Sequence, residues 1–189
     1  MSPFPSLPAA SLLMSKTLMP VTVTIAFGAL LSAPAWSAEL ALNVEIPKLD
    51  VAEYHRPYVA IWVEGADQKD VADLAVWYQT RDTAEGHGTK WLPDLRQWWR
   101  KSGRNLQVPV GGVTGPTRPA GLHALKFTDK QPQLARLAPG NYTLVVEAVR
   151  EVGGRELLKI PFAWPVKKAA TAKAQGSSEL GTVTLNAKP

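Results

Sequence analysis

The chain has 189 residues, of which 46% are hydrophobic and 20% are charged, a balance typical of a globular protein. It contains no cysteine, which excludes disulfides, thiolate zinc sites, iron–sulfur clusters and covalently attached haem. The formal net charge is +5, but the arginines are scattered along the chain and form no basic stripe, so we expect no nucleic-acid binding.

Residues 1–37 have the pattern of a secretory signal peptide. A single cation, Lys16, precedes an apolar stretch at 18–31, and small residues end the segment. The apolar stretch is interrupted by Pro20 and is shorter than the roughly 20 residues that span a bilayer. We therefore expect cleavage after Ser37, a periplasmic location and a mature chain without a transmembrane segment.

The mature chain, residues 38–189, is predicted to form a single domain that begins with three strands. Strict alternation of apolar and polar residues predicts a strand at 40–46 with one buried side. The strands predicted at 57–64 and 73–80 carry large apolar residues on both faces. We expect these two strands to be central in a sheet or covered by another element.

A short helix is predicted at 91–102, where the pattern changes period. Leu92, Leu95 and Trp99 recur at helical spacing, and Gly103 follows as a residue suited to the end of a helix. The segment contains three tryptophans. We expect it to cover one face of the sheet.

The second half of the domain reads as strands again. A loop rich in Pro and Gly at 105–120 precedes a strand predicted at 121–127. A turn with two glycines then joins strands predicted at 142–150 and 156–164 into a hairpin.

The chain ends with a segment that lacks core-forming residues. Residues 167–178 consist mainly of Ala, Lys, Gln and Ser, and we expect them to be a mobile linker before a last edge strand at 181–185. The number and spacing of the strands predict a mainly β protein, an immunoglobulin-like β-sandwich with one short inserted helix.

Several segments spread over the mature chain point to a known family. They are PYVAIWVE at 57–64, KWL at 90–92, TGPTRPAG at 114–121, GNYTL at 140–144 and ELGTV at 179–183. Together they resemble a family of predicted bacterial periplasmic proteins, domain of unknown function 2271. The resemblance implies an exported β-rich domain with no established reaction. It also implies an association with inner-membrane proteins and flavin-transfer systems, and therefore a setting of flavin- or iron-linked electron chemistry.

The sequence lacks the motifs of the common catalytic sites. It contains no Gly-x-Ser-x-Gly nucleophile elbow and no phosphate-binding P-loop, and no spacing pairs two carboxylates for glycosidase chemistry. The histidines His55, His87 and His123 are too widely spaced to match a metal-ligand motif. We therefore predict that the protein is not an enzyme, and we assign it no metal site and no cofactor.

The candidate binding surface combines tryptophan with cationic side chains. An exposed tryptophan beside an arginine is common at interface hot spots and suits stacking on planar ligands or sugar rings. Tryptophan is also well buried on average, and we expect Trp77 and Trp91 to belong to the core. The residues assigned to the binding surface lie on the predicted helix, in the following loop and on the next strand: Trp98, Trp99, Arg100, Thr114, Thr117, Arg118 and His123.

These observations favour a non-catalytic periplasmic binding or accessory module that serves a flavin- or iron-linked membrane system. Its partner would be a protein at the inner membrane or a planar small ligand. Two alternatives remain open at this point. One is a periplasmic carrier of flavin, haem or a metal ion, and the other is a carbohydrate-binding β-sandwich with tryptophan platforms.

Overall fold

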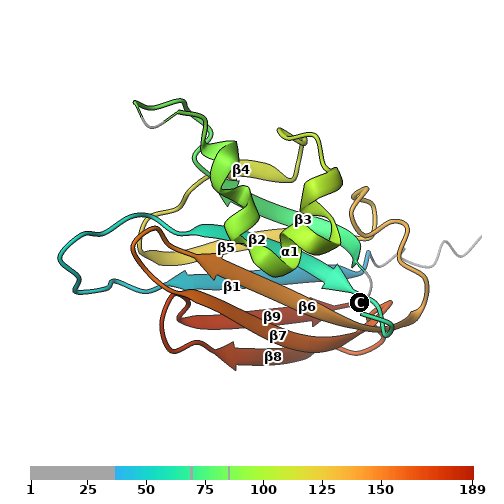
Figure 1. Ribbon diagram of the computed structural model, residues 1–189. Helices are drawn as coiled ribbons and strands as arrows, with labels where there is room; N and C mark the ends of the chain where they lie inside the picture. Colours follow the sequence, from blue (N-terminus) through green and yellow to red (C-terminus); the bar gives the residue numbers. More distant parts are fainter. Residues whose placement is uncertain (1–36, 69, 85) are drawn as a thin grey trace, which may run out of the picture. The chain divides into compact units, whose positions relative to one another are not determined.

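The computed structural model describes residues 37–189 apart from 69 and 85. The predicted signal peptide and its cleavage site therefore lie almost entirely outside the described residues. The described part of the chain is mainly β and contains two sheets and one short α-helix (Figure 1).

The first sheet has four strands in the order β5-β1-β9-β8. All of its neighbouring strands are antiparallel. Its strands are β1 (Glu39–Ile46), β5 (Gly121–Thr128), β8 (Ala170–Gln175) and β9 (Thr182–Lys188).

The second sheet has five strands in the order β4-β3-β2-β6-β7. Its neighbours are antiparallel except for β3 and β4, which run parallel. Its strands are β2 (Tyr58–Glu64), β3 (Asp70–Tyr78), β4 (Thr114–Pro116), β6 (Gly140–Val149) and β7 (Arg155–Trp164).

The main core lies between the two sheets. Along β1 the residues alternate strictly between partly buried and buried, and the buried set includes Leu40, Leu42 and Val44. They belong to the same apolar cluster as Ile61 and Val146 from the five-stranded sheet. The alternation predicted at 40–46 is confirmed, because a period of two turns one side of a strand toward the core.

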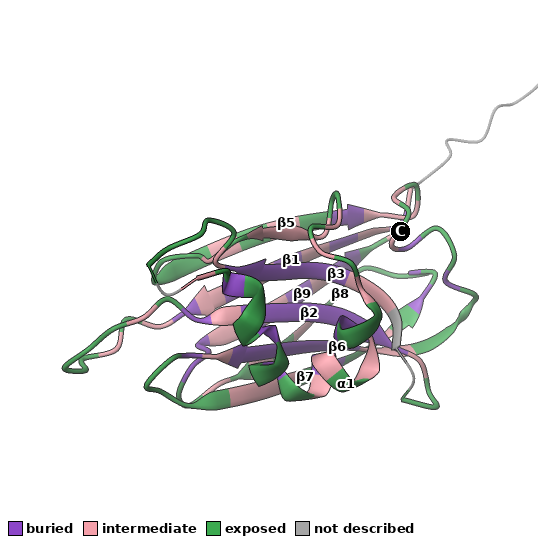
Figure 2. Cartoon of the chain, turned by 45° about the horizontal axis from the view of Figure 1, so that its top comes forward, coloured by how far each residue is buried: buried purple, intermediate pink, exposed green. Residues whose placement is uncertain are grey.

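A second core covers the outer face of the five-stranded sheet. Two 3-10 turns, η1 (Gly88–Asp94) and η2 (Gly103–Asn105), flank the helix α1 (Arg96–Lys101), and apolar side chains from η1 and α1 pack on Trp62 and Val76. Figure 2 shows β2 and β6 buried along most of their length beneath these turns. The predicted helix therefore covers a sheet face as expected, but it is shorter than 91–102, because Pro93 lies in the 3-10 turn.

Two predictions for the C-terminal segment are wrong. Residues 170–175, expected to be part of a mobile linker at 167–178, form the edge strand β8. Its partner β9 lies between β1 and β8 and is not an edge strand. Ala172 and Ala174 turn their small side chains toward the core, and pairing with β9 orders a strand that carries no large apolar residue.

Candidate functional site

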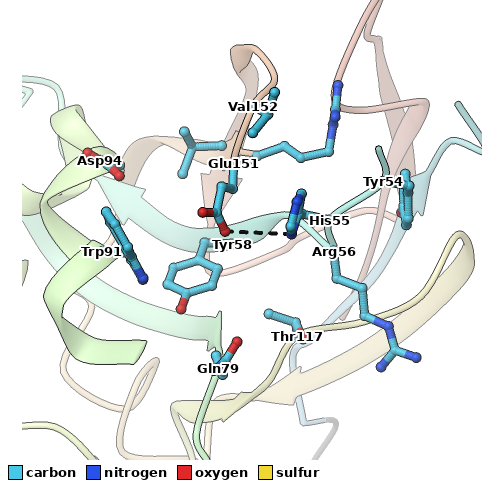
Figure 3. Close-up of a pocket in the computed structure, with 12 residues that line it drawn as sticks. Tyr54, His55, Arg56, Tyr58, Gln79, Trp91, Asp94, Thr117, Glu151 and Val152 are labelled. Carbon is cyan, nitrogen blue, oxygen red and sulfur yellow. Dashed lines mark ion pairs between the residues drawn. The ribbon is translucent and has the colours of Figure 1, made fainter. Parts of the chain in front are cut away.

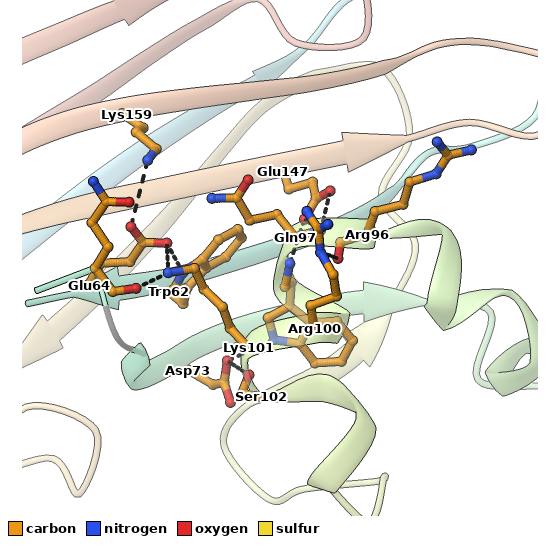
Figure 4. A network of polar contacts seen from close by, with 12 residues as sticks. Trp62, Glu64, Asp73, Arg96, Gln97, Arg100, Lys101, Ser102, Glu147 and Lys159 are labelled. Atoms are coloured by element: carbon orange, nitrogen blue, oxygen red, sulfur yellow. Dashed lines mark hydrogen bonds and ion pairs between the residues drawn. The ribbon is translucent and has the colours of Figure 1, made fainter.

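A buried carboxylate on β6 anchors the start of helix α1. Glu147 is fully buried and accepts hydrogen bonds from the backbone N–H groups of Gln97, at 3.1 Å, and Trp98, at 2.8 Å. Its other neighbour is the guanidinium of Arg155, whose Nε lies 2.5 Å away. The first N–H groups of a helix have no partner within the helix, and the helix dipole favours a negative charge beside them. Glu147 therefore fixes where α1 begins on the sheet (Figure 4).

A second carboxylate fixes the orientation of the helix. Asp73 on β3 accepts hydrogen bonds from the indole Nε1 of Trp98, at 2.7 Å, and from the hydroxyl of Ser102, at 2.9 Å. Burial raises the pKa of Asp73, against the effect of these two hydrogen bonds. Trp98 has no exposed surface and lies in the second core. The expectation that Trp98 belongs to a contact surface is therefore wrong, because Asp73 holds its ring on the inner side of the helix.

A third carboxylate, at the end of β2, lies beside the last residue of helix α1. Glu64 is buried and accepts a hydrogen bond from the indole of Trp62, at 3.0 Å. Two ammonium groups neutralise it, with Nζ of Lys101 at 3.1 Å and Nζ of Lys159 at 3.7 Å. These contacts tie the last residue of α1 to strands β2 and β7, so both ends of the helix are held (Figure 4).

A cavity of about 440 Å³ opens next to this helical layer. It forms where the β1–β2 loop, the ends of β2 and β3, the turn η1, the segment after β4 and the β6–β7 hairpin meet. We call it the aromatic cavity, and its lining residues are Tyr54, His55, Arg56, Tyr58, Gln79, Trp91, Asp94, Thr117, Val149, Arg150, Glu151 and Val152 (Figure 3).

Three aromatic side chains form much of its wall. Tyr54 and Trp91 are exposed by 39% and 40%, whereas Tyr58 is half-buried. The Tyr58 hydroxyl donates to the carbonyl of Gly88, at 3.1 Å, which links the strand to the turn that carries Trp91. The ammonium of Lys90 lies 4.6 Å from the centre of the Trp91 ring, a favourable cation–π distance.

The polar lining of the cavity carries charges of both signs. His55 lies between two carboxylates, with Nε2 at 2.8 Å from Glu53 and Nδ1 at 3.6 Å from Glu151. Figure 3 shows the side chains of Glu151 and His55 pointing toward one another above Tyr58. The deeper cation of the site, Arg150, is neutralised by a buried ion pair outside the cavity. The accessible lining thus offers both hydrogen-bond donors and acceptors.

The residues singled out from the sequence lie in different surroundings in the structure. Thr117, assigned to the binding surface, lines the aromatic cavity. Trp91, expected in the core, is exposed there instead, whereas Trp77 is buried as expected. Trp99 is half-buried against the second core, and Arg100 is exposed but donates to the carbonyl of Arg96 on its own helix.

The remaining predicted residues lie elsewhere. The hydroxyl of Thr114 donates to the carbonyl of Val110, so it braces its own loop. Arg118 and His123 gather around Trp77, with the guanidinium carbon 5.4 Å and the imidazole centre 5.7 Å from the indole. They line a separate, shallower hollow beside β5 and do not reach the aromatic cavity.

The main omission of the sequence reasoning is the loop before β2. Tyr54 and Arg56 are not among the residues predicted to form a binding surface, and His55 enters the prediction only as a candidate metal ligand. An aromatic, an imidazole and a guanidinium in succession just before Pro57 are the signal that could have found them. Glu151 and Val152, in the hairpin opposite, carry no comparable signal.

Two further findings bear on the chemistry. Among the described residues there is no group of three His, Asp or Glu side chains placed to hold a metal ion. No helix in the same part of the chain has the length and apolar character needed to cross a membrane.

The comparisons with known proteins give one match. The model of the family described as "Predicted periplasmic protein (DUF2271)" matches residues 39–182. This match confirms the resemblance and the periplasmic location predicted from the sequence. The searches of the curated proteins and of the solved structures found no match.

Proposed function

The chain belongs to the DUF2271 family of predicted periplasmic proteins, and we propose that it is a non-catalytic binding module whose ligand site is the aromatic cavity. The observation that carries the proposal is the meeting of three aromatic side chains and a mixed polar lining in a concave space of about 440 Å³. Binding sites for small molecules typically combine such a space with a few convergent polar groups.

The distribution of exposed apolar side chains supports this location. Five large apolar residues are exposed in the described part of the chain, and three of them, Tyr54, Trp91 and Val152, line this one cavity. Scattered exposed apolar residues need no explanation, but a cluster around a hollow marks a binding surface.

The charges around the cavity favour a neutral ligand with hydrogen-bond donors. Glu151 and Asp94 line the cavity, and a purely apolar ligand would remove their carboxylates from water without compensation. A ring that stacks on Trp91 and offers hydroxyl or N–H groups to these acids satisfies both requirements. Riboflavin and neutral sugars both meet this description, and they represent the flavin-carrier and carbohydrate-binding alternatives.

The strand order supports the finer immunoglobulin-like assignment as part of this proposal. In variable immunoglobulin domains the larger sheet adds two strands to the edge of its C strand. The order β4-β3-β2-β6-β7, with β6 and β7 as a hairpin, matches that order, although β3 and β4 run parallel whereas immunoglobulin sheets are antiparallel. In such sandwiches the loops gather at the ends of the sheets, where they form binding sites.

The proposal is tested by titrating the mature protein with riboflavin and with N-acetylglucosamine, each followed by calorimetry. We expect one of the two to bind, and Trp91→Ala to weaken that binding by about tenfold or more, since stacking on one aromatic ring contributes about 1–3 kcal/mol. Trp99→Ala is the matched control, because Trp99 is a half-buried tryptophan outside the cavity.

Absence of binding by both probes would overturn the ligand site. Equal losses in Trp91→Ala and Trp99→Ala would refute its location, since a general loss of folding would then explain the effect. If the ligand site fails, a protein partner at the inner membrane becomes the leading candidate. It would be sought at the same exposed residues.

A further inference from the structure

A second concave site lies on another side of the domain, between the edge strands of the two sheets. It has a volume of about 520 Å³. Strand β7 is the last strand of the five-stranded sheet and β8 is the last strand of the four-stranded sheet. Figure 1 shows β7 and β8 side by side, with β9 next to β8. We call this site the edge groove.

The walls of the edge groove are apolar. Phe162 and Trp164 come from β7, Val166 from the connection to β8, and Leu185 from β9. The remaining lining residues are small or prolines apart from one asparagine and two lysines: Pro139, Gly140, Asn141, Pro161, Ala163, Pro165, Lys167, Lys168, Ala170, Ala172 and Ala187. Four alanines at wall positions leave a space that larger side chains would fill.

The charge of the edge groove has one sign. Lys167 and Lys168 are its only charged lining residues, and both are exposed. The aromatic cavity differs in both respects, since it is mainly polar and carries acids as well as cations. The two sites therefore suit ligands of different chemistry.

We propose that the edge groove binds a fatty acid, with the acyl chain against the apolar walls and the carboxylate beside Lys167 and Lys168. The apolar lining favours an alkyl chain, because each buried methylene contributes a fixed transfer free energy. The two lysines select an anionic head group over a neutral one by charge complementarity. A periplasmic protein works between two lipid membranes. This inference does not depend on the proposed function of the aromatic cavity.

The test is calorimetric titration of the mature protein with octanoate, decanoate and dodecanoate below their micelle concentrations. We expect affinity to rise by about fourfold for each added methylene, the factor that corresponds to about 0.8 kcal/mol. Dodecanol, which has the same chain length and no charge, should bind more weakly than dodecanoate.

Three variants locate the site and the head group. The double variant Lys167→Gln/Lys168→Gln should weaken dodecanoate binding by about tenfold and leave dodecanol binding unchanged. Lys173→Gln is its matched control, because Lys173 is an exposed lysine of β8 that does not line the groove. Ala170→Trp should weaken both ligands, because Ala170 is exposed at the start of β8 and its side chain lines the groove.

The outcomes separate the proposal from its competitors. Failure of the wild-type protein to bind dodecanoate overturns the proposal, and so does binding that is independent of chain length. Equal effects of the lysine pair and of Lys173→Gln overturn the role of the head-group cations. Tight binding of an extended apolar peptide without fatty-acid binding would also overturn it, and would indicate strand addition at β7 or β8. Binding of riboflavin or sugar at the aromatic cavity should be the same in all these variants.

Discussion

Replacing Glu147 with alanine removes the acceptor that holds the start of helix α1. The variant loses hydrogen bonds from the backbone N–H groups of Gln97 and Trp98 and leaves both groups facing a buried gap. A hydrogen bond to a charged group contributes about 1.5–3 kcal/mol, and a buried donor left unpaired costs about 1–3 kcal/mol. The ion pair with Arg155 adds little, because about a third of that side chain is exposed.

These contributions overlap, so we expect Glu147→Ala to lower the free energy of unfolding by about 3–5 kcal/mol. With a urea slope of about 2 kcal/mol per molar, the unfolding midpoint falls by about 2 M. Glu147→Gln keeps one acceptor oxygen and should lose about half as much. Arg155→Ala should also lose stability, because it leaves the fully buried carboxylate of Glu147 without its counter-ion. Urea unfolding measures all three.

A loss below about 1 kcal/mol in Glu147→Ala would refute this reasoning. It would mean that packing alone holds α1 on the sheet. The turn η1 immediately precedes α1 and carries Trp91. Urea midpoints and ligand affinity measured on the same variants therefore show whether the anchor of the helix also maintains the aromatic cavity.

Three further predictions concern the surroundings of the cavity and the pH dependence of stability. Gly88→Ala should destabilise the fold by about 1–3 kcal/mol and weaken ligand binding. The reason is steric, because an added Cβ would lie 2.1 Å from the carbonyl oxygen of Gln79. Unchanged urea midpoints would contradict this prediction. Asp73→Asn keeps an acceptor for Trp98. Because burial raises the pKa of Asp73 in the folded protein, the wild type loses stability as pH rises above the ordinary pKa of an aspartate. The free energy of unfolding of Asp73→Asn relative to that of the wild type should therefore rise between acidic and neutral pH. A difference that does not change with pH would be evidence against the burial. Partial burial opposes ionisation of Glu156, but hydrogen bonds from the chain at 177–180 outweigh it and lower its pKa. Glu156→Gln should therefore be less stable than the wild type at neutral pH, with a difference that vanishes as pH falls through the acid range.

The strand pattern of this protein is largely readable from its sequence, because burial on one side of a strand imposes a period of two. The residues from Leu40 to Ile46 show this plainly, whereas the hairpin around Gly153 is signalled by the two glycines of its turn. Strand β8 is not readable in this way. Its side chains are alanine, lysine, threonine and glutamine, and its order comes from pairing with β9 rather than from its own composition.

The orientation of the tryptophans is the least predictable feature. The segment after residue 90 contains Trp91, Trp98 and Trp99 on a helix of only six residues and a 3-10 turn, so helical spacing gives no reliable face. Which ring turns inward depends on Asp73 and on Glu147, which are distant in the sequence. Contacts of this range leave no local pattern.

The candidate site is hard to predict for a related reason. The aromatic cavity is assembled from segments as far apart as Tyr54 and Glu151, and each contributes one to four residues. Of the residues assigned to a binding surface from the sequence, only Thr117 lies in it. The loop at 54–56 carried a usable signal, whereas the opposing hairpin is recognisable only once the sheet brings it near.

The indole N–H signal of Trp91 in a two-dimensional ¹H–¹⁵N spectrum tests the central claim most directly. The signal is assigned from its absence in Trp91→Phe, and the mature protein is then titrated with riboflavin and, separately, with N-acetylglucosamine. If the aromatic cavity is the ligand site, one of the two probes shifts the Trp91 signal in a saturable manner and leaves the buried indole of Trp98 in place. If neither probe moves the Trp91 signal at millimolar concentration, the cavity does not bind these ligands and the proposed function is wrong.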